Sequence, residues 1–581
     1  MNPLRTEWFD KVDRDCPLAD YPRPQFVRKD WMCLNGEYDY AITGDSDRFP
    51  TTYEGKILVP FSVESDISGV NRALLPFERL WYRRYFTLDD TFAGKHTVLH
   101  FGAVDWECRV FINGNLAGSH KGGYNPFEFD ITDLLKDGEN ELIVRVYDPT
   151  NEGYQQRGKQ LLKPVGFWYT ATSGIWQTVW LEPVSENRIN SIRITPDIDN
   201  RSVKLNAEII GTGKLNVKVL DGDSIVFNGA VEPNCEIPVP DAKLWSPENP
   251  FLYNLELSLN DSEDEVSSYF GMRKFSIMKD EKGIPRLALN NKPYFQRGLL
   301  DQGYWPESQL TPPTDEAMIF DISEMKRLGF NMLRKHIKEE PLRWYYHCDR
   351  LGMIVWQDMI SGGKPLNLIY AGAFPNINVH VKDNQYKMFN RDLPEWREEF
   401  EEEYKGLIDN LYNCVSICTW VPFNEGWGQF DAKRIGEWTK KYDPTRLVDH
   451  ASGWHDQHGP DFKSVHKYIT PVHMPTARRQ AGRPFVLSEY GGYSWNIEGH
   501  VWNYRRSFGY IQYKNSENLS QAYRKLHFNQ IIPLVLKGLS ATVYTQVSDV
   551  EFEVNGIYSY DRKVLKVSEE VLKECNEALK Y

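Results

Sequence analysis

The feature that most constrains the fold is a change in hydrophobic pattern near residue 280 of the 581-residue chain. Before it, short segments alternate apolar and polar residues, which is the two-residue period of strands with one buried face. Beyond it, short apolar strands alternate with helical segments, which predicts β/α units around a parallel sheet. The strand candidates are residues 293–300, 331–336, 353–358, 415–423, 446–451, 462–468, 485–489 and 541–547. Because these are eight, a closed (β/α)₈ TIM barrel is favoured over an open sheet.

The residues before the barrel are expected to form two β-sandwiches. Residues 1–185 contain short strands and turn signals such as Asn113-Gly114 but no long helical segment, which favours a jelly-roll β-sandwich. Residues 186–279 contain a second, smaller set of short strands, which fits an immunoglobulin-like β-sandwich. The predicted domains are therefore 1–185, 186–279 and, for the barrel, 280–581.

Helix signals separate several of the barrel strands. Thr314 is a candidate N-cap for a helix that Gly329 ends, and a second helix is expected over residues 341–351. Pro394 opens a third, acidic helix. These signals support strand–helix alternation throughout the second half of the chain.

Charge and cysteine usage exclude several classes of protein. A net charge of −13 argues against nucleic acid or an anionic membrane surface as a partner. No apolar run is long enough to span a bilayer, and the N-terminus has no apolar signal core. We therefore expect a cytoplasmic protein, or a secreted or periplasmic one if a signal peptide was removed. The eight cysteines form no Cys-x-x-Cys pair, so neither a disulfide framework nor a zinc site is expected.

Two glutamates stand directly after buried strands of the predicted barrel. The apolar strand 415–423 runs into Asn424-Glu425, and residues 485–487 run into Ser488-Glu489. Chemistry in such barrels lies at the carboxyl ends of the strands. Glycosidic bond hydrolysis needs two carboxyl groups that flank the anomeric carbon, one to protonate the leaving oxygen and one to stay ionised. Either glutamate alone could equally be a structural ion-pair partner, but two at matching positions favour a catalytic pair.

Sequence motifs across nearly the whole chain resemble those of glycoside hydrolase family 2, which includes β-galactosidases, β-glucuronidases and β-mannosidases. In the barrel the motifs are FNMLRKH, CDRLGMIVWQD, WVPFNEGWGQ, LSEYGG and TQVSDVEFEVNG, and before it they include LWYRRYF, SGIWQTVWLE and KLWSPENPFLY. The resemblance implies a retaining exo-β-glycosidase with Glu425 as acid/base and Glu489 as nucleophile. It also implies that Asn424 holds the 2-hydroxyl of the sugar. Tyr468 is the candidate for the tyrosine that orients the nucleophile, with an ordinary tyrosine at the barrel rim as an equal alternative.

Departures from the family pattern bear on the sugar and on metal binding. The histidine after the second strand is His336, shifted by one position from its place in typical β-galactosidases. The third strand ends in WQDM, closer to mannosidase-like members, and residues 359–363 (MISGG) lack the magnesium ligands of some β-galactosidases. We therefore expect no catalytic metal and no cofactor. Specificity is expected to be β-galactosidase-like, with β-mannosidase, β-glucuronidase and β-glucosaminidase as alternatives.

Further pocket candidates follow from position at strand ends, and for each a structural hydrogen bond is as plausible as a sugar contact. They are Asp301, Arg334, His336, Asp358, His466, Gln546 and Asp549, with Trp427 and Trp495 as rings that could stack on a sugar. The expected partner is a β-glycoside or oligosaccharide. A carbohydrate-binding protein without catalysis is the alternative from another class, and homo-oligomers are possible by analogy with the family.

Overall fold

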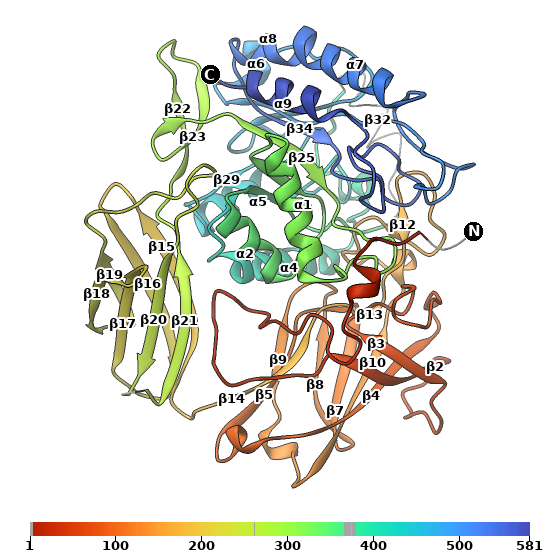
Figure 1. The fold of residues 1–581 in the computed structure, drawn as a ribbon, viewed down its shortest axis with the longest axis vertical. Coiled ribbons are helices and arrows are strands. Elements are labelled where there is room, and N and C mark those ends of the chain that lie inside the picture. The colour runs from red at the N-terminus through yellow and green to blue at the C-terminus, as the bar shows by residue number, and fades with distance from the viewer. Residues whose placement is uncertain (1–3, 261, 365–373, 375–378) are drawn as a thin grey trace.

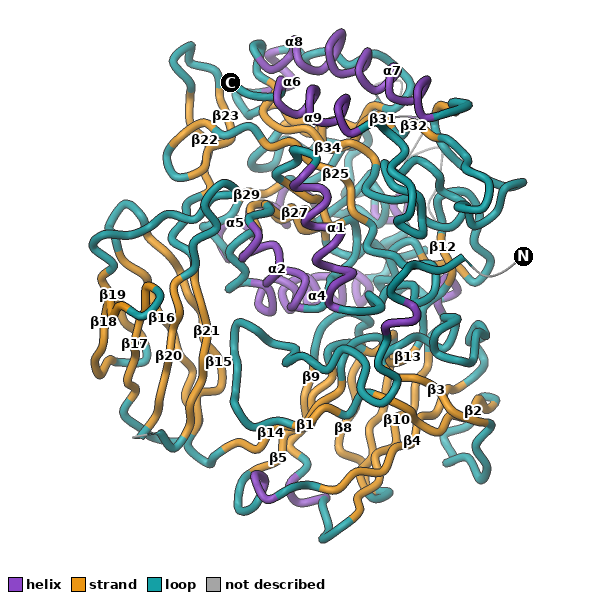
Figure 2. The backbone as a smooth tube through the Cα atoms, in the orientation of Figure 1, coloured by secondary structure: helices purple, strands orange, loops and turns teal. Residues whose placement is uncertain are grey.

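The computed structural model describes residues 4–260, 262–364, 374 and 379–581. It confirms the predicted architecture of two β-sandwiches followed by a barrel (Figure 1). The first sandwich is drawn in red and orange below the barrel, and the second in yellow-green at its side. Figure 2 shows that both sandwiches are made mainly of strands and that the long helices surround the barrel.

The first sandwich packs a six-stranded antiparallel sheet against a four-stranded one. In β7 (Glu107–Ile112), Cys108, Val110 and Ile112 point into the core and alternate with more exposed residues, as the two-residue period requires. The predicted turn at Asn113-Gly114 joins β7 to β8 (Asn115–Lys121), and both residues have positive φ angles. In spatial order the strands of the larger sheet are β3 (Gly55–Val59), β2 (Gly36–Thr43), β4 (Arg79–Thr87), β10 (Glu139–Tyr147), β7 (Glu107–Ile112) and β8 (Asn115–Lys121). Those of the smaller sheet are β1 (Met32–Cys33), β14 (Val179–Val184), β5 (His96–Phe101) and β9 (Phe127–Asp130).

Short elements connect these sheets. Two small pairs are β6 (Val104–Asp105) with β13 (Gly174–Ile175) and β11 (Gln160–Leu161) with β12 (Tyr169–Thr170), and the 3₁₀ turns are Phe9–Lys11, Asp90–Phe92, Thr132–Leu134 and Thr150–Glu152. The segment around β11 and β12 leaves the sandwich and lies on the barrel. There Arg157 N and Gly158 N donate hydrogen bonds to Ser361 O.

The second sandwich packs a three-stranded sheet against a four-stranded one around Val217, Val219, Leu255 and Leu257. The sheets contain β15 (Arg188–Asp197), β16 (Ser202–Ile210) and β19 (Asn234–Pro238), and β18 (Ser224–Val231), β17 (Leu215–Asp221), β20 (Tyr253–Leu259) and β21 (Asp264–Phe270). A small sheet of β22 (Phe275–Lys279), β23 (Pro285–Leu289) and β24 (Lys292–Pro293) leads into the barrel.

The barrel is a curled eight-stranded parallel sheet, and each of its strands lies within or overlaps one of the predicted segments. In spatial order they are β29 (Leu447–Val448), β28 (Ile417–Val421), β27 (Ile354–Asp358), β26 (Met332–Lys335), β25 (Gln296–Asp301), β34 (Leu539–Thr545), β31 (Phe485–Gly491) and β30 (Lys463–Lys467). The ends of this sheet approach each other through an isolated bridge between Asp449 and Asp461. The carboxyl ends of the strands therefore lie at one mouth.

The three predicted helix signals are confirmed. The Thr314 side chain accepts a hydrogen bond from Ala317 N at the start of α1, and Gly329 follows its end with a φ of 91°. The helices are α1 (Asp315–Arg327), α2 (Leu342–Leu351), α4 (Pro394–Leu411), α5 (Ala432–Tyr442), α6 (Ala477–Gln480), α7 (Ser516–Leu526), α8 (Ile532–Val535) and α9 (Glu569–Ala578), with a 3₁₀ turn at Tyr386–Phe389 and a π turn at His527–Ile531. A short pair, β32 (Tyr493–Ser494) and β33 (Ile511–Gln512), lies beyond β31. Within the described residues, no helix combines the length and the apolar composition needed to cross a membrane.

Candidate active site

A cavity of about 470 Å³ lies at the mouth of the barrel. Two sets of residues line most of it. The floor consists of side chains at or just after the barrel strand ends, which are His336, Asn424, Glu425, Tyr468 and Glu489. The wall consists of Lys159, Phe167 and Trp168 from the first sandwich and Phe508, Tyr510 and Glu553 from loops late in the chain.

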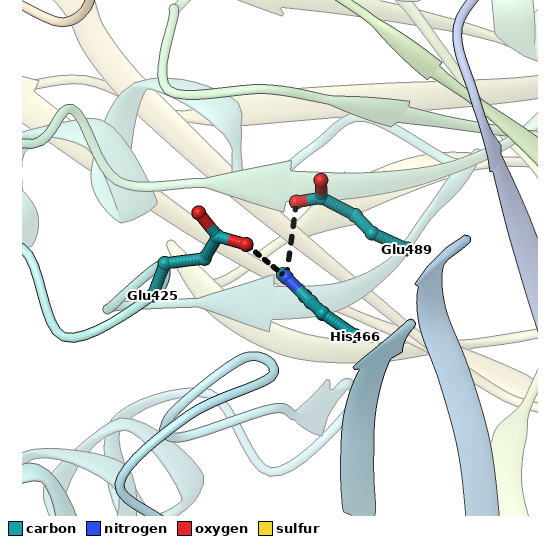
Figure 3. A group of neighbouring side chains, drawn as sticks. All are labelled: Glu425, His466 and Glu489. Carbon is teal, nitrogen blue, oxygen red and sulfur yellow. Dashed lines mark hydrogen bonds and ion pairs between the residues drawn. The ribbon is translucent and has the colours of Figure 1, made fainter. Parts of the chain in front are cut away.

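The two glutamates predicted from the sequence meet across the floor (Figure 3). The ring of His466 on β30 lies between them, with Nδ1 2.7 Å from Glu425 Oε1 and 3.6 Å from Glu489 Oε1. One carboxylate oxygen of each glutamate and one nitrogen of this histidine lie within 4.8 Å of one another. The hydroxyl of Tyr468 is hydrogen-bonded to Glu489 Oε2 and lies 3.2 Å from Glu425 Oε1. A reacting atom in this space can therefore touch both carboxylates.

The backbone at Glu425 has an unusual conformation that positions its side chain. Its φ of 52° is in the left-handed region, which costs roughly 1–2 kcal/mol for a residue with a Cβ. Glu425 N donates a hydrogen bond to Ser452 O at 3.0 Å, which holds the turn, and Gly426 continues it with a φ of 70°. Strain of this kind collects at functional sites, where surrounding contacts maintain it.

Arg334 on β26 lies beneath the floor, fully buried, and organises it. Its guanidinium makes a two-point ion pair with Asp358 at 2.8 and 2.9 Å, and Nη1 donates to Glu489 Oε1 at 3.0 Å. Nη2 also donates to Asn424 Oδ1 at 2.9 Å. Burial alone would lower the pKa of Arg334, but the charges of Asp358 and Glu489 outweigh burial and raise this pKa above its ordinary value. The arginine therefore stays charged and fixes Glu489 and Asn424 together.

His336 supplies a neutral group to the floor. Burial, with the positive charges of Lys159 and Arg334, lowers the pKa of His336 well below its ordinary value. Its Nδ1 lies 3.0 Å from Gln302 Oε1, which can only accept, so the ring proton belongs on Nδ1. Nε2 is then an acceptor, lies 3.8 Å from Glu489 Oε1, and makes no hydrogen bond within the described part of the chain. A hydroxyl group of a bound molecule can satisfy it.

A charged pair that joins two domains belongs to the wall. Lys159 Nζ of the first sandwich donates to Glu553 Oε2 at 3.1 Å and lies 3.2 Å from the hydroxyl of Tyr169. Nearby, Thr170 N donates to Glu551 Oε1 at 2.8 Å. These contacts hold the segment around β12 against the barrel, so the first sandwich completes the cavity.

The structure divides the site residues predicted from the sequence into three groups. Lining the cavity are Asn424, Glu425, Trp427, Tyr468, Glu489 and His336. Behind it are Arg334 and His466, which contact those residues, and Asp358, which pairs with Arg334. Away from the cavity lining are Asp301, Gln546, Asp549 and Trp495.

The residues of the third group do not line this cavity and have other partners, as the structural alternative for each of them predicts. Asp301 pairs with Lys335 at 2.7 Å, and Asp549 pairs with Lys566 at 2.7 Å, both inside the protein. Gln546 accepts a hydrogen bond from Gln302, and Trp495 packs against the barrel core. Their strand-end or loop positions were compatible with a pocket, but their side chains serve the interior.

The wall residues were missed in the sequence, and so was Trp454. A signal for two of them exists in the stretch Lys163-Pro-Val-Gly-Phe-Trp-Tyr169, where adjacent large rings follow a proline and a glycine in a segment without strand period. Aromatic rings in such a loop, outside any core pattern, indicate a contact surface.

Three residues in the described part of the chain could together hold a metal ion, and they are Glu425, His466 and Glu489. In the structure these side chains are engaged with one another, with Arg334 and with Tyr468. The carboxylates are therefore arranged as a hydrogen-bonded set around a cavity.

Three parts of the chain match models of one protein family. Residues 57–183 match the model described as glycosyl hydrolases family 2, sugar binding domain, and residues 187–273 match the model named glycosyl hydrolases family 2. Residues 286–580 match the TIM barrel domain of the same family.

The individual relatives have low sequence identity to this chain. A β-galactosidase of Clostridium acetobutylicum is 25% identical over 530 residues, covering 84% of this chain and 54% of that protein. The chain spans about half the length of the curated relatives that it matches. Among solved structures, a β-D-glucuronidase of Dictyoglomus thermophilum has a TM-score of 0.75 at 19% identity, covering 96% of this chain and 98% of that one. A Ruminococcus gnavus β-glucuronidase has a TM-score of 0.77 at 17% identity, with coverage of 96% and 98%. These structural matches show the shared fold.

Proposed function

Because the chain belongs to glycoside hydrolase family 2, we propose that it is a β-glycosidase that removes a terminal β-linked sugar with retention of configuration. The observation that carries this proposal is the approach of Glu425 and Glu489, whose facing carboxylate oxygens lie within 4.8 Å of each other. Retaining enzymes hold their two carboxyl groups about 5–5.5 Å apart, whereas inverting enzymes leave roughly 6.5–9.5 Å for a water molecule. The short separation supports direct attack by one carboxylate.

Glu489 is the group suited to attack. Arg334 donates to one of its oxygens and Tyr468 to the other, so the carboxylate is held in one orientation beside a positive charge. Attack of Glu489 on the anomeric carbon forms a glycosyl-enzyme, and the glycosidic bond to the leaving oxygen breaks. Tyr468 and Arg334 keep the attacking oxygen aligned during this step.

Glu425 is the group suited to proton transfer. Its side chain is 20% exposed, against 4% for Glu489, so it lies on the solvent side of the pair. In the first step Glu425 gives its proton to the leaving oxygen. In the second step it takes a proton from water, which attacks the anomeric carbon and releases Glu489. His466, 2.7 Å from Glu425 Oε1, positions this carboxyl group.

Action at a chain end is supported by the shape of the site. The wall from the first sandwich and the late loops closes one side of the barrel mouth, which makes a pocket of about 470 Å³. Such a pocket accommodates one terminal sugar with part of its leaving group. Asn424, held by Arg334, faces the cavity and is suited to bind the sugar 2-hydroxyl.

For the sugar itself we propose β-galactosidase-like specificity, with β-glucuronidase, β-mannosidase and β-glucosaminidase activities as alternatives. The relative from Clostridium acetobutylicum favours the first, and the glucuronidase folds favour the second. We further propose catalysis without a metal ion, because two carboxylates supply both required functions. Incubation with EDTA should then leave kcat/KM unchanged, and loss of activity that magnesium restores would refute this part.

The test is a panel of 4-nitrophenyl β-glycosides that includes galactoside, glucuronide, mannoside, glucosaminide and fucoside. Hydrolysis of one of them, with the β-anomer formed first as seen by proton NMR, is the expected result. Glu489→Gln should lose at least about 10⁴-fold in kcat, as expected when a catalytic nucleophile is removed. Initial formation of the α-anomer would exclude retention. Binding of sugars without turnover would instead favour a carbohydrate-binding protein.

A further inference from the structure

The lining of the cavity changes from polar to apolar with distance from its base. The deep residues, each at most 6% exposed, are mainly polar and include His336, Asn424, Glu489, Thr545 and Glu553. The half-buried residues nearer the opening are mainly aromatic, and they are Phe167, Trp168, Trp454, Phe508 and Tyr510. Lys159, Glu425 and Lys467 are half-buried polar lining residues, Thr470 is an exposed one, and Ile469 beside it is 70% exposed. Most of the deep groups can therefore bind sugar hydroxyls, and most of the aromatic lining lies nearer the opening.

Four of the five outer rings, all except Trp454, belong to a continuous chain of contacts. Trp427 meets Trp168 edge-on with centroids 4.9 Å apart, and Trp168 contacts its neighbour Phe167. Phe167 contacts Phe508 at 5.4 Å, Phe508 contacts Tyr510 at 5.3 Å, and Tyr510 stacks on Tyr468 at 3.8 Å. We name Phe167, Trp168, Phe508 and Tyr510 the aromatic rim.

The ends of this chain connect the aromatic rim to both catalytic carboxyl groups. Trp427 is two residues after Glu425, and Tyr468 is hydrogen-bonded to Glu489. A general acid must lie within hydrogen-bond reach of the leaving oxygen. A leaving group that extends from that oxygen toward the opening would therefore pass along the aromatic rim.

We propose that the aromatic rim is the binding site for the leaving group and that it selects a flat, apolar aglycone. This inference rests on the proposed glycosidase function. Aromatic rings offer faces and edges to another ring at centroid distances of about 4.5–7 Å. They offer few partners for hydroxyl groups, and a sugar in this place would leave most of its hydroxyls without protein partners. Two of the four rings belong to the first sandwich, so that domain contributes directly to substrate choice.

The test compares three substrates that share the sugar identified by the panel and differ in the leaving group. They are the 4-methylumbelliferyl glycoside, a disaccharide with a second sugar as leaving group, and the glycosyl fluoride, whose leaving group cannot reach the rim. Trp168→Ala and Phe167→Ala should each lower kcat/KM for the umbelliferyl substrate about tenfold, mainly by raising KM, as expected for loss of one aromatic contact. Hydrolysis of the fluoride should stay within about twofold, since the deep site is untouched. Trp168→Phe, which keeps a ring, should recover most of the loss.

The control is Phe77→Ala, which removes a 62% exposed ring of the same sandwich that does not line the cavity. Equal losses on the umbelliferyl substrate and the fluoride, no loss on either, or a larger loss on the disaccharide would each overturn the proposal. Binding of free 4-methylumbelliferone, measured by calorimetry, separates this inference from the proposed function. If the wild type hydrolyses nothing but binds umbelliferone about tenfold more tightly than Trp168→Ala, the glycosidase proposal fails and the aromatic rim as an aryl-binding site stands.

Discussion

The floor and the wall of the cavity are built in different ways. The floor uses side chains at the ends of the barrel strands, and its ionic groups are paired, as in the set of Arg334, Asp358 and Glu489. The wall is assembled from two domains, and beside it Glu551 has a carboxylate oxygen without a hydrogen-bond partner in the described structure. Rigid strand ends hold reacting groups more accurately than loops do. We therefore propose that the floor carries the chemistry and that the wall sets which substrate reaches it.

The largest effect should come from Glu425→Gln, which separates proton transfer from the rest of the floor. A poor leaving group needs the proton of Glu425, so kcat/KM for an alkyl glycoside should fall about 10³-fold. A 2,4-dinitrophenyl glycoside leaves as a stable anion and should lose much less in the first step. Rates with the two substrates, measured side by side, test this difference.

Glu489→Gln is the matched control, because the nucleophile is needed whatever the leaving group. It should abolish turnover of both substrates to a similar degree. If Glu425→Gln also lost activity equally on both, the assignment of Glu425 as general acid would be wrong, and the functional division within the floor would have to be redrawn.

Arg334→Lys should have the next largest effect. Lysine keeps the charge but cannot bind Asp358, Glu489 and Asn424 at once, because it lacks the planar fork of arginine. The misplaced nucleophile should lower kcat about 10²-fold, with a smaller change in KM. Steady-state kinetics on the best panel substrate measure both constants.

Arg562→Lys provides the control for structural damage. Arg562 forms a similar buried pair with Asp321, 3.0 Å away, at a place outside the cavity lining. Both variants should lower the melting temperature, but Arg562→Lys should leave kcat near wild type. A comparable loss of kcat in both would show that Arg334 acts on stability alone.

The contrast between the floor and the wall also explains which parts of the site could be predicted from the sequence. The eight barrel strands and the pair Glu425 and Glu489 are visible because local hydrophobic period and strand-end position determine them. The fold is confirmed, whereas the catalytic roles remain predictions. Arg334 and Asp358 were recognised by position, but the structure places them beneath the cavity as supports, which position alone does not show.

The wall was missed because docking between domains creates it. Lys159 precedes the short strand β11, where no periodic pattern marks it, and its partner Glu553 lies almost four hundred residues away. A single sequence contains no signal for such a long-range contact. The same limit explains why Asp301 was a candidate pocket residue. Its strand-end position is compatible with a pocket, but its carboxylate pairs with Lys335.

Lys159→Met should have a moderate effect on KM, and it tests whether the wall contributes to substrate specificity. Removing the lysine leaves Glu553 without its cation and takes away a positive charge that lowers the pKa of His336. We expect KM for the preferred panel substrate to rise about tenfold, with kcat changed less. Relative rates across the sugars of the panel should also shift, which they should not do in Glu425→Gln.

Lys121→Met is the control for ion pairs between these two domains. Lys121 also belongs to the first sandwich and pairs with a barrel glutamate, Glu399, at 2.8 Å, but it lies outside the main cavity and is partly exposed. Surface pairs of this kind contribute little, so its kinetics should match wild type. A loss of kcat in Lys159→Met with no change in KM would place this lysine in the chemistry of the floor.

The smallest effect concerns the stability of the wall as pH rises. Burial raises the pKa of Glu551 to about 7, from 4.5 for an ordinary glutamate. The folded protein therefore binds this proton more tightly than the unfolded chain, and the resulting stabilisation is lost as pH rises from about 4.5 to about 7. Between pH 6 and 8 the loss should be about 1 kcal/mol.

Glu551→Gln cannot ionise, so its free energy of unfolding should fall less than that of the wild type over this interval, as measured by urea denaturation at both pH values. Equal slopes for the two proteins would mean that Glu551 is already ionised at pH 6. The contrast between the ion-paired carboxylates of the floor and a wall carboxyl with no ion pair in the described structure would then be lost.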